Sequence, residues 1–356
     1  MTVYACLDCG EKADSAAGHQ CVHCGGMVGL PDGITFDTEK IQPDLPGIWR
    51  FQESFGLPYD SPVLTLGEGN TPLVPVKILG HELYLKLESC NPSGSYKDRL
   101  AAVLVSALAG SGVRSAVEDS SGNAGAAFAA YAALAGIEAK VYVPDSASGP
   151  KRIQIERYGA QVIAVPGPRQ KATEAVLQAV HQGAVYASHA LLPQGLTGVA
   201  TIAYELVEEL GRTPGAVLAP VGHGGLLLGI VLGFRALLAA GEITELPMFI
   251  GVQARNNAPL WAAANQMEFI PLPTAAEGIA VPQPARMREL LDLHREDVVR
   301  LTVIDEEHIR VSWEVLARHG IYAEPTSAVV WQAFLQTQNE LKPPVVAVIS
   351  GHGLKA

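Results

Sequence analysis

Aromatic residues are scarce in this chain of 356 residues, and so is positive charge. Aromatic side chains account for 6% of the residues, whereas hydrophobic residues account for 48%, and many of these are alanine. We therefore expect a sizeable core with slim, closely packed helices. Lys and Arg number 25 against 36 Asp and Glu, which gives a net charge of −11. Binding along a nucleic-acid backbone requires a positive field, so the composition argues against that function.

Long hydrophobic runs are missing as well. A membrane-spanning helix needs about 18 or more consecutive apolar residues, and no run in the sequence reaches that length. The N-terminus also lacks a charged region followed by an apolar stretch, so no secretory signal is expected. These absences favour a soluble, cytoplasmic protein that acts on a small molecule, with no nucleic-acid and no membrane partner.

Five cysteines are present, and four of them form the pairs Cys6-x2-Cys9 and Cys21-x2-Cys24, each followed at once by glycine. Two such turns can present four thiolates to one tetrahedral zinc ion. In a cytoplasmic chain, metal binding is favoured over disulfides. We therefore predict a structural zinc site at these four cysteines; turns without metal, or thiols that oxidise, are the alternatives. Cys90 is left over and is expected to be a buried, small apolar residue.

Strands and helices are predicted to alternate from residue 62 onward. The expected strands are 83–87, 115–118, 140–143, 161–165, 216–219, 249–253, 299–303 and 345–349, and the expected helices are 100–108, 123–135, 151–158, 171–181, 196–210, 226–239, 306–319 and 327–336. This alternation predicts an α/β fold with two open, mostly parallel sheets flanked by helices. We predict four parts: a small N-terminal zinc ribbon (1–30), a Pro-rich linker or arm (31–61), a large domain (62–98 and 186–356) and a small mobile domain (99–185).

Lys97 lies in the run Asn91-Pro-Ser-Gly-Ser-Tyr-Lys-Asp-Arg99, between a turn and a predicted helix. A lysine amine can form a Schiff base with an aldehyde cofactor, and a loop-to-helix junction gives it a fixed direction. The alternative is an ordinary solvated lysine. The surrounding run is informative only in combination with two further segments.

The first of these segments, Ser120-Ser121-Gly122-Asn123, follows the predicted strand 115–118 and opens a predicted helix. Backbone N–H groups at a helix N-terminus bind anions, and serine hydroxyls add donors. We expect Ser120, Ser121 and Gly122 to bind a substrate carboxylate. Plain capping of the helix by serine or asparagine is the alternative.

The second segment, Gly222-His223-Gly224-Gly225-Leu226, also joins a predicted strand to an apolar helix. Glycines let the backbone wrap closely around a phosphate group. The Lys-Ser/Thr end of a Walker loop and the strict dinucleotide glycine spacing are both absent, so the segment predicts a site for a single phosphate. A tight strand-to-helix turn is the alternative. Ser350 follows the last predicted strand, and its hydroxyl could bond a ring nitrogen or merely begin a glycine-rich turn.

Together these segments resemble the fold-type II pyridoxal-phosphate enzymes, and within them the threonine synthases most closely. The sequence motifs that carry the resemblance are Gly67–Leu73, Asn91–Arg99, Ser120–Asn123, Gly222–Gly225, Glu324–Ala328 and Ser350–Lys355. The resemblance implies a tryptophan-synthase-β-like architecture in which the large domain binds pyridoxal 5'-phosphate, and a homodimer. By this resemblance Lys97 is the Schiff-base lysine, Asn123 contacts the 3'-oxygen of the cofactor, and Gly222, His223, Gly224, Gly225 and Leu226 hold its phosphate. Ser350 is the partner of the pyridine nitrogen.

The resemblance implies a lyase that converts O-phosphohomoserine and water into threonine and phosphate. The chain departs from the family in the stretch 188–201, which lacks the basic and amide groups expected for the substrate phosphate. Arg255, Arg286 and His189 are candidates to replace them. The departures, together with the segment 276–282, leave open a serine/threonine dehydratase or a β-replacement enzyme acting on a small hydroxy- or O-activated amino acid. A degenerate, non-catalytic domain that only binds is a third possibility, which the intact Lys97 opposes.

Overall fold

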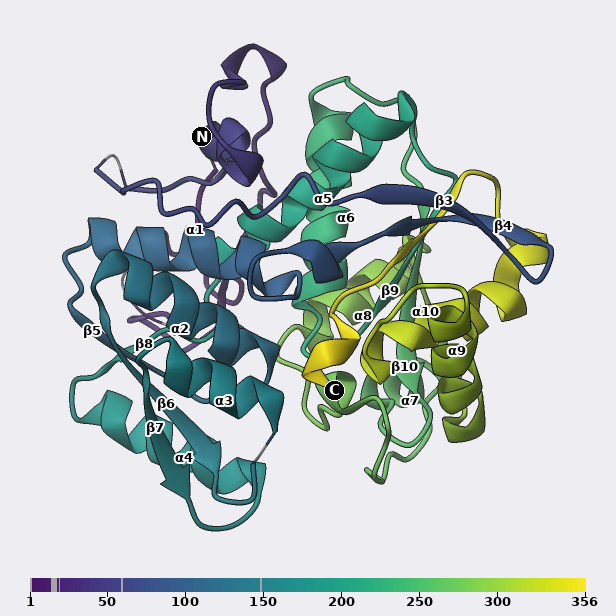
Figure 1. The fold of residues 1–356 in the computed structure, drawn as a ribbon. Helices are drawn as coiled ribbons and strands as arrows, with labels where there is room; N and C mark the ends of the chain where they lie inside the picture. Colours follow the sequence, from purple (N-terminus) through teal and green to yellow (C-terminus); the bar gives the residue numbers. More distant parts are fainter. Residues whose placement is uncertain (1, 14–17, 19, 59, 148) are drawn as a thin grey trace. The chain divides into compact units, whose positions relative to one another are not determined.

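A computed structural model describes residues 2–13, 18, 20–58, 60–147 and 149–356 (Figure 1). The chain divides into two compact units. The first unit comprises Met1–Gly69 and Lys97–Gly198, and the second comprises Asn70–Tyr96 and Val199–Ala356. The α/β class with two mostly parallel sheets, predicted from the sequence, is confirmed. The boundaries predicted at residues 61, 98 and 185 do not coincide with those of the units, and as a division into domains they stay a prediction.

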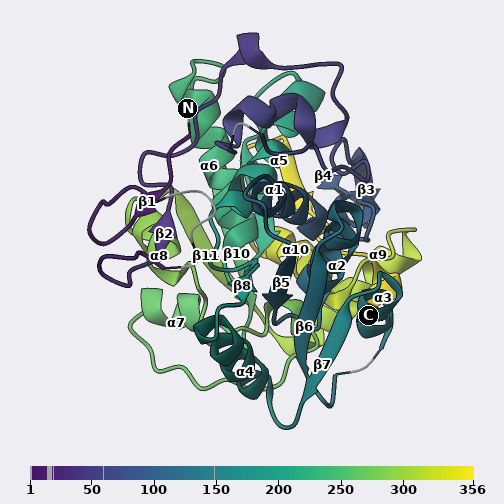
Figure 2. The same cartoon turned by 90° about the vertical axis from the view of Figure 1, so that its left-hand side faces the viewer.

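The first unit is built on a four-stranded parallel sheet in the order β7-β6-β5-β8. Its elements are α1 (Lys97–Gly110), β5 (Ser115–Glu118), α2 (Asn123–Ala135), β6 (Glu138–Pro144), α3 (Pro150–Arg157), β7 (Gln161–Val165), α4 (Arg169–His181), β8 (Val185–Tyr186) and the start of α5 (Gln194–Leu210). Figure 2 shows α4 on one side of this sheet and α2 on the other. Because α2 is largely alanine, it packs closely between α1 and the sheet.

The second unit is built on a six-stranded sheet in the order β11-β10-β9-β12-β4-β3. All neighbours are parallel except β3 and β4. Its elements are β3 (Leu73–Ile78), β4 (His81–Lys86), η3 (Glu88–Cys90), β9 (Ala216–Pro220), α6 (Gly225–Ala239), β10 (Met248–Ala254), α7 (Pro259–Ala264), η4 (Glu277–Ile279), α8 (Met287–Arg295), β11 (Val299–Ile304), α9 (Glu306–Arg318), α10 (Pro325–Thr337), η5 (Gln338–Glu340), β12 (Val345–Val348) and η6 (Gly353–Lys355), with the rest of α5. Every residue of β9 and β12 is buried, as expected for central strands of a sheet covered on both faces.

The N-terminal segment belongs to the first unit. It contains the antiparallel pair β1 (Ala5–Cys6) and β2 (Val28–Gly29), followed by η1 (Thr38–Lys40) and η2 (Gly47–Ser54). Thr2 donates its hydroxyl to the Ser54 carbonyl oxygen at 2.7 Å. Trp49 is 1% exposed and donates its indole N–H to the Glu68 carboxylate at 2.9 Å. Glu68 also accepts a bond from the hydroxyl of Tyr131 in α2 at 2.6 Å, which connects the segment to the helices of its unit.

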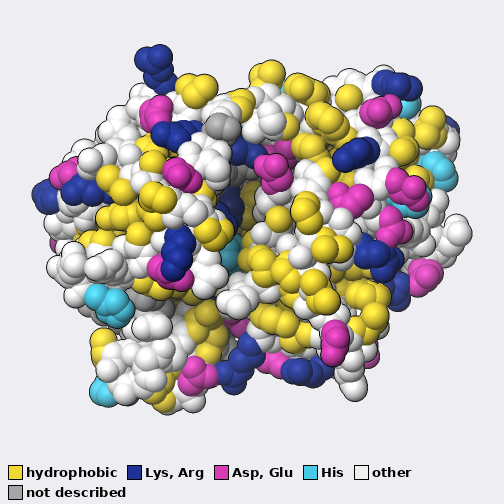
Figure 3. Space-filling view, turned by 90° about the horizontal axis from the view of Figure 1, so that it is seen from below, with side chains coloured by type: hydrophobic (Ala, Val, Ile, Leu, Met, Phe, Trp, Pro, Cys, Tyr) yellow, Lys and Arg dark blue, Asp and Glu magenta, His cyan; other side chains and the backbone are white. Residues whose placement is uncertain are grey.

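The surface carries charges of both signs. On the face in Figure 3, Lys and Arg side chains are interspersed with Asp and Glu, and no field of one sign extends across it. This mixed pattern gives a nucleic-acid backbone no continuous positive track on that face. Within the described ranges, every helix is too short or too polar to cross a lipid bilayer.

Candidate functional site

Three strands of the second unit end at the same edge of its sheet. β4, β12 and β9 are adjacent and parallel, with Ala347 of β12 opposite both Leu85 and Leu218. The segment leading to Lys97 follows β4, the glycine loop follows β9, and Ser350 follows β12. In open α/β sheets, ligands bind outside the carboxyl ends of the strands. The fold of this unit therefore gathers these three segments where a ligand site is expected.

The glycine loop leads into a long helix whose N-terminus has no side-chain cap. Gly224 is the N-cap of the 15-residue helix α6, with φ of 98°. A Cβ on Gly224 would lie 2.7 Å from Leu290 Cδ1, and one on Gly222 would lie 3.1 Å from the Gly278 carbonyl oxygen. A side chain on Gly224 would be strained by its positive φ and crowded by α8, and one on Gly222 would require the Gly278 backbone to shift. No side chain of the loop caps the first N–H groups of α6. This geometry fits a phosphate group.

The side chains of His223 and Leu226, two further residues of the loop, are engaged with the rest of the second unit. Leu226 is 2% exposed, so its side chain is committed to the core. The carbonyl oxygen of His223 accepts a bond from the Arg286 N–H at 3.0 Å, and its Nδ1 accepts one from the Ala285 N–H at 3.4 Å. His223 thus fastens the loop to the start of α8.

Ser350 is held by a second serine that the sequence did not single out. Its Oγ lies 2.9 Å from Ser327 Oγ, and Ser327 Oγ also accepts a bond from the Gly351 N–H at 2.9 Å. Both hydroxyls are almost completely buried. Ser327 belongs to α10 and lies in the motif Glu324–Ala328. The resemblance assigned no individual role to this serine. Its position holds the Ser350 hydroxyl oxygen in place.

The segment before Lys97 is fastened to the end of β12. The Tyr96 N–H donates to the Ser350 carbonyl oxygen at 3.0 Å, and Ser95 forms a β-bridge with Gly351. Ser95 is fully buried, and among the described residues its hydroxyl has no hydrogen-bond partner. Such a buried hydroxyl is a natural partner for a polar ligand group. Lys97 is the next residue after Tyr96 and begins α1. The backbone just before the lysine is therefore held by the hydrogen bond of Tyr96.

Within the first unit, the Ser120–Asn123 loop joins β5 to α2. Gly122 is the N-cap of α2 and makes no side-chain cap bond, while its N–H donates to Ser120 Oγ at 3.2 Å. A Cβ on Gly125 would lie 1.9 Å from the Ser120 carbonyl oxygen, so the helix can pack this closely on the loop only with glycine there. Ser121, Gly122 and Asn123 are half-buried. The N-cap residue of α2 thus makes no side-chain cap bond, and the helix N-terminus is suited to bind an anion.

Glu118, at the end of β5, is a buried carboxyl group beside this loop. Its Oε2 accepts the Ser120 N–H at 2.5 Å, and its Oε1 lies 2.5 Å from Nδ1 of His189. Burial raises the pKa of Glu118 to about 7, and the Ser120 N–H, Arg169 and Lys97 oppose that rise. Burial, followed by the charge of Lys97, holds the pKa of His189 well below its usual value. His189 is therefore a neutral imidazole at neutral pH.

Of the arginines proposed to meet a substrate phosphate, neither is a simple free cation. Arg255 is half exposed and paired with Asp305, while Arg286 is 1% exposed and lies 3.2 Å from Glu289. Arg169, which the sequence did not point to, is exposed at the start of α4 and acts electrostatically on both Glu118 and His189. Arg169 could have been considered from the sequence because it follows strand β7 and the turn Gly167-Pro168, at the start of a helix.

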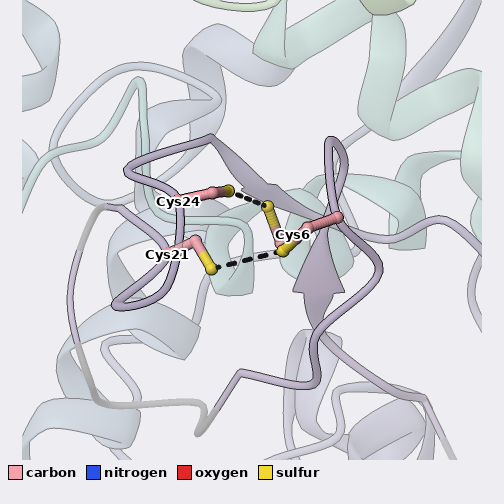
Figure 4. A group of neighbouring side chains, drawn as sticks. Cys6, Cys21 and Cys24 are labelled. Atoms are coloured by element: carbon pink, nitrogen blue, oxygen red, sulfur yellow. Dashed lines mark hydrogen bonds between the residues drawn. The ribbon is translucent and has the colours of Figure 1, made fainter.

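The four N-terminal cysteines converge within the first unit. Their sulfur atoms all lie within 4.8 Å of one another, with Cys6 to Cys24 at 3.5 Å and Cys9 to Cys21 at 3.7 Å. In Figure 4 the sulfur atoms of Cys6, Cys21 and Cys24 point toward one another. Tetrahedral zinc with bonds of about 2.3 Å spaces its sulfur ligands about 3.8 Å apart, so the cluster fits that ion.

Backbone groups prepare one of these thiols for metal binding. The N–H groups of Cys9 and Asp8 lower the pKa of the Cys6 thiol to about 7. All five cysteines lie in the described part of the chain and are free of disulfides, and Cys90 is exposed. The expectation that Cys90 is buried is wrong, because it ends the short η3 turn after β4 instead of pointing into the sheet.

Comparisons with known proteins decide the family. A profile described as "Pyridoxal-phosphate dependent enzyme" matches residues 64–351. The chain belongs to this pyridoxal-phosphate-dependent enzyme family. Among curated relatives, a threonine synthase of Methanocaldococcus jannaschii is 32% identical, covering 98% of this chain and 92% of the relative. A threonine synthase of Synechocystis is 33% identical over 83% of this chain and 79% of the relative.

Solved structures of several enzymes share the fold. A bacterial structure described as a threonine deaminase superposes with a TM-score of 0.67 at 26% identity, covering 79% of this chain and 92% of that one. An O-ureido-L-serine synthase superposes with a TM-score of 0.67 at 24% identity, covering 80% and 90%. The fold-type II architecture inferred from sequence words is thus confirmed, while these relatives carry different activities on the same scaffold.

Proposed function

We propose that this chain is a lyase of the threonine synthase type, which converts O-phosphohomoserine and water into threonine and phosphate. Phosphate leaves from Cγ with the electrons of the broken C–O bond, and the oxygen of water then adds to Cβ. The observation that carries the proposal is the threonine synthase of M. jannaschii, which aligns with 98% of the chain. The order and placement of the site segments support it.

We assign residue roles for each of the two units in turn. In the second unit, we assign the cofactor phosphate to Gly222–Leu226 and the pyridine nitrogen to Ser350, which Ser327 orients. In the first unit, we assign the Schiff base to Lys97, the 3'-oxygen to Asn123 and the substrate carboxylate to Ser120–Gly122. When bound, pyridoxal phosphate supplies an aldehyde carbon and a conjugated ring that withdraws electrons from the substrate. The Lys97 Nζ removes the proton from substrate Cα.

A second candidate function is a serine/threonine dehydratase or β-replacement reaction. The observation in its favour is His189, which is neutral and bonded to Glu118 in the stretch where a substrate phosphate would need cations. A buried phosphate dianion without such partners is strongly unfavourable. A hydroxyl or acyl leaving group makes no such demand. The neutral hydroxyl of Ser350 is compatible with either reaction.

A substrate panel separates these two functions. With purified holoenzyme, we expect O-phosphohomoserine to give threonine and phosphate, and serine, threonine and O-acetylserine to give little 2-oxo acid or replacement product. We propose Arg169, an exposed arginine that acts electrostatically on Glu118 and His189, as the cation that meets the substrate phosphate. Arg169→Ala is then expected to raise the KM for O-phosphohomoserine by about tenfold or more, because a charge-assisted bond contributes about 1.5–3 kcal/mol. Product formation is measured by amino-acid analysis and by phosphate release.

Arg157→Ala is the matched control, since Arg157 is an exposed arginine at the end of α3 in the same unit. It should leave the KM unchanged. Turnover of serine or threonine to a 2-oxo acid, without any turnover of O-phosphohomoserine, would reject the threonine synthase reaction in favour of the dehydratase. An equal effect of Arg169→Ala on phosphorylated and unphosphorylated substrates would remove Arg169 as the phosphate ligand.

We also propose that Cys6, Cys9, Cys21 and Cys24 hold one structural zinc ion. Four sulfur ligands leave no open position for substrate, so the ion would serve stability. Elemental analysis should find one zinc per chain, and chelation should increase hydrogen exchange in residues 2–30 while the visible absorption of the cofactor persists. The expected effect is large because structural zinc sites contribute about 10–16 kcal/mol of binding free energy.

Cys90→Ser is the control for the zinc experiment, since Cys90 is a free cysteine outside the cluster. It should keep the full zinc content, whereas Cys21→Ser should lose it. Protein produced in excess zinc that contains none would refute the metal site.

A further inference from the structure

The pair formed by Glu118 and His189 has a geometry that requires a proton. Glu118 is 0% exposed, and both of its oxygens have neighbours: His189 Nδ1 and the Ser120 N–H, each at 2.5 Å. An imidazole nitrogen and a carboxyl oxygen this close need a proton between them, because two lone pairs would otherwise face each other. The proton belongs either to the ring nitrogen or to the carboxyl group.

The electrostatics of the site make both positions of that proton accessible. Burial raises the pKa of Glu118 to about 7, so its carboxyl group can stay protonated near neutrality. Burial keeps His189 from becoming a full cation. The pair therefore carries either one negative charge or none, and it changes between these states by gaining or losing one proton.

Charged groups face the pair from several elements. Lys97 on α1 and Arg169 on α4 act on both members as cations. Asp119 favours a protonated His189, but its own oxygens are engaged with Tyr186 at 2.9 Å and Thr173 at 2.7 Å. All of these groups belong to the first unit, so the balance is set within one compact unit.

The pair is connected directly to the loop assigned to the substrate carboxylate. Glu118 holds the backbone N–H of Ser120, and the Ser120 Oγ in turn accepts the Gly122 N–H at 3.2 Å. A negative Glu118 at this place repels an incoming carboxylate, whereas a neutral pair does not. Arrival of an anion at the loop consequently favours the protonated form of the pair.

We propose that Glu118 and His189 are positioning residues that share one bridging proton, and that the pair takes up a second proton when the carboxylate of an amino acid binds at Ser120–Gly122. This inference rests on the proposed function, which places the substrate carboxylate at that loop. The sign follows from the linkage: below a pH of about 7 the pair already holds the second proton, so affinity does not change with pH. Above that pH the proton must come from solvent, and affinity falls by up to about tenfold per pH unit.

The test uses the holoenzyme and L-alanine, an amino acid without a leaving group at Cβ. Its dissociation constant is measured by calorimetry from about pH 6 to about pH 8.5, in buffers of different ionisation heat, which gives the number of protons taken up. Glu118→Gln keeps an acceptor for the Ser120 N–H and a donor for His189 but cannot titrate. We expect it to flatten the pH dependence and to reduce proton uptake above pH 7 by up to about one proton.

Glu174→Gln is the matched control, because Glu174 is an exposed carboxylate on α4, paired with Lys171 at 2.6 Å in the same unit. It should behave like the wild type. Equal proton uptake in Glu118→Gln and wild type would overturn the proposal while leaving the proposed function intact.

A second measurement follows the pair without any ligand. In protein labelled with 13C at the glutamate carboxyl carbons, one resonance should titrate near pH 7 and be missing in Glu118→Gln. Absence of that titration would overturn the shared proton. If the resonance titrates but L-alanine binds at no pH, the linkage to ligand is overturned and the role of the Ser120–Gly122 loop in the proposed function fails with it.

Discussion

Replacing Lys97 with alanine is expected to give a colourless protein that has lost its activity. The wild type, purified with pyridoxal phosphate, should absorb visible light because the lysine nitrogen becomes conjugated with the cofactor ring. Lys97→Ala removes that link and also the amine that takes the Cα proton, so turnover should fall by about 10²–10⁴-fold or more. An absorption spectrum and an assay with O-phosphohomoserine measure the two effects.

Lys171→Ala is the control for this experiment, since Lys171 is an exposed lysine of α4 whose partner is Glu174. It should keep both colour and activity. Circular dichroism should show the same fold in both variants, because Lys97 begins a helix whose core contacts come from later residues. Persistence of the visible band in Lys97→Ala would mean that another residue carries the cofactor.

Local patterns were sufficient to predict most of the regular structure. The strand Ser115–Glu118 and the helix Asn123–Ala135 have the predicted bounds. Both are bounded by strong local signals: the serine and glycine turn before the helix, and Gly136 with φ of 66° after it. α10 begins at Pro325, two residues before the predicted start, because proline at the first helical position was not counted as part of the helix.

Two of the elements that were not predicted, β3 and η2, lack such signals. β3 (Leu73–Ile78) contains Pro75 and lies at the edge of the sheet, antiparallel to β4, which is where a strand tolerates proline. η2 lies in the Pro-rich stretch that predicts an irregular arm, yet it buries Ile48, Trp49 and Phe51. These side chains are buried by residues of the first unit that are distant in the sequence. The local sequence therefore does not predict their burial.

The same limit applies to the candidate site. Lys97, the two loops and Ser350 were found because each lies in a recognisable run of residues. Ser327 and Glu118 were not, since each acts through a partner distant in sequence: Ser350 for the first and His189 for the second. His189 itself was noticed only as a potential cation, and the structure shows that burial beside Glu118 keeps it neutral. Tertiary pairing thus determined the chemistry of residues whose types were visible in the sequence.

Gly224→Val is expected to weaken the affinity for pyridoxal phosphate by about tenfold or more, which corresponds to about 1.4 kcal/mol. The new Cβ would lie 2.7 Å from Leu290 Cδ1 and 3.0 Å from Arg286 Cβ, so it collides with α8. The loop must shift away from α8, and the N–H groups at the start of α6 then no longer converge on the phosphate. A valine at φ of 98° adds backbone strain to this displacement.

Gly241→Val separates displacement of the loop from backbone strain alone. Gly241 follows the other end of α6, has φ of 80°, and a Cβ there would have no neighbour within 4 Å. That variant should lose about 1–2 kcal/mol of folding free energy through strain and keep the cofactor affinity of the wild type. Affinity is measured by titrating the apoenzyme with pyridoxal phosphate and following the visible band. If Gly224→Val binds the cofactor as tightly as Gly241→Val does, the phosphate is held by some other part of the chain.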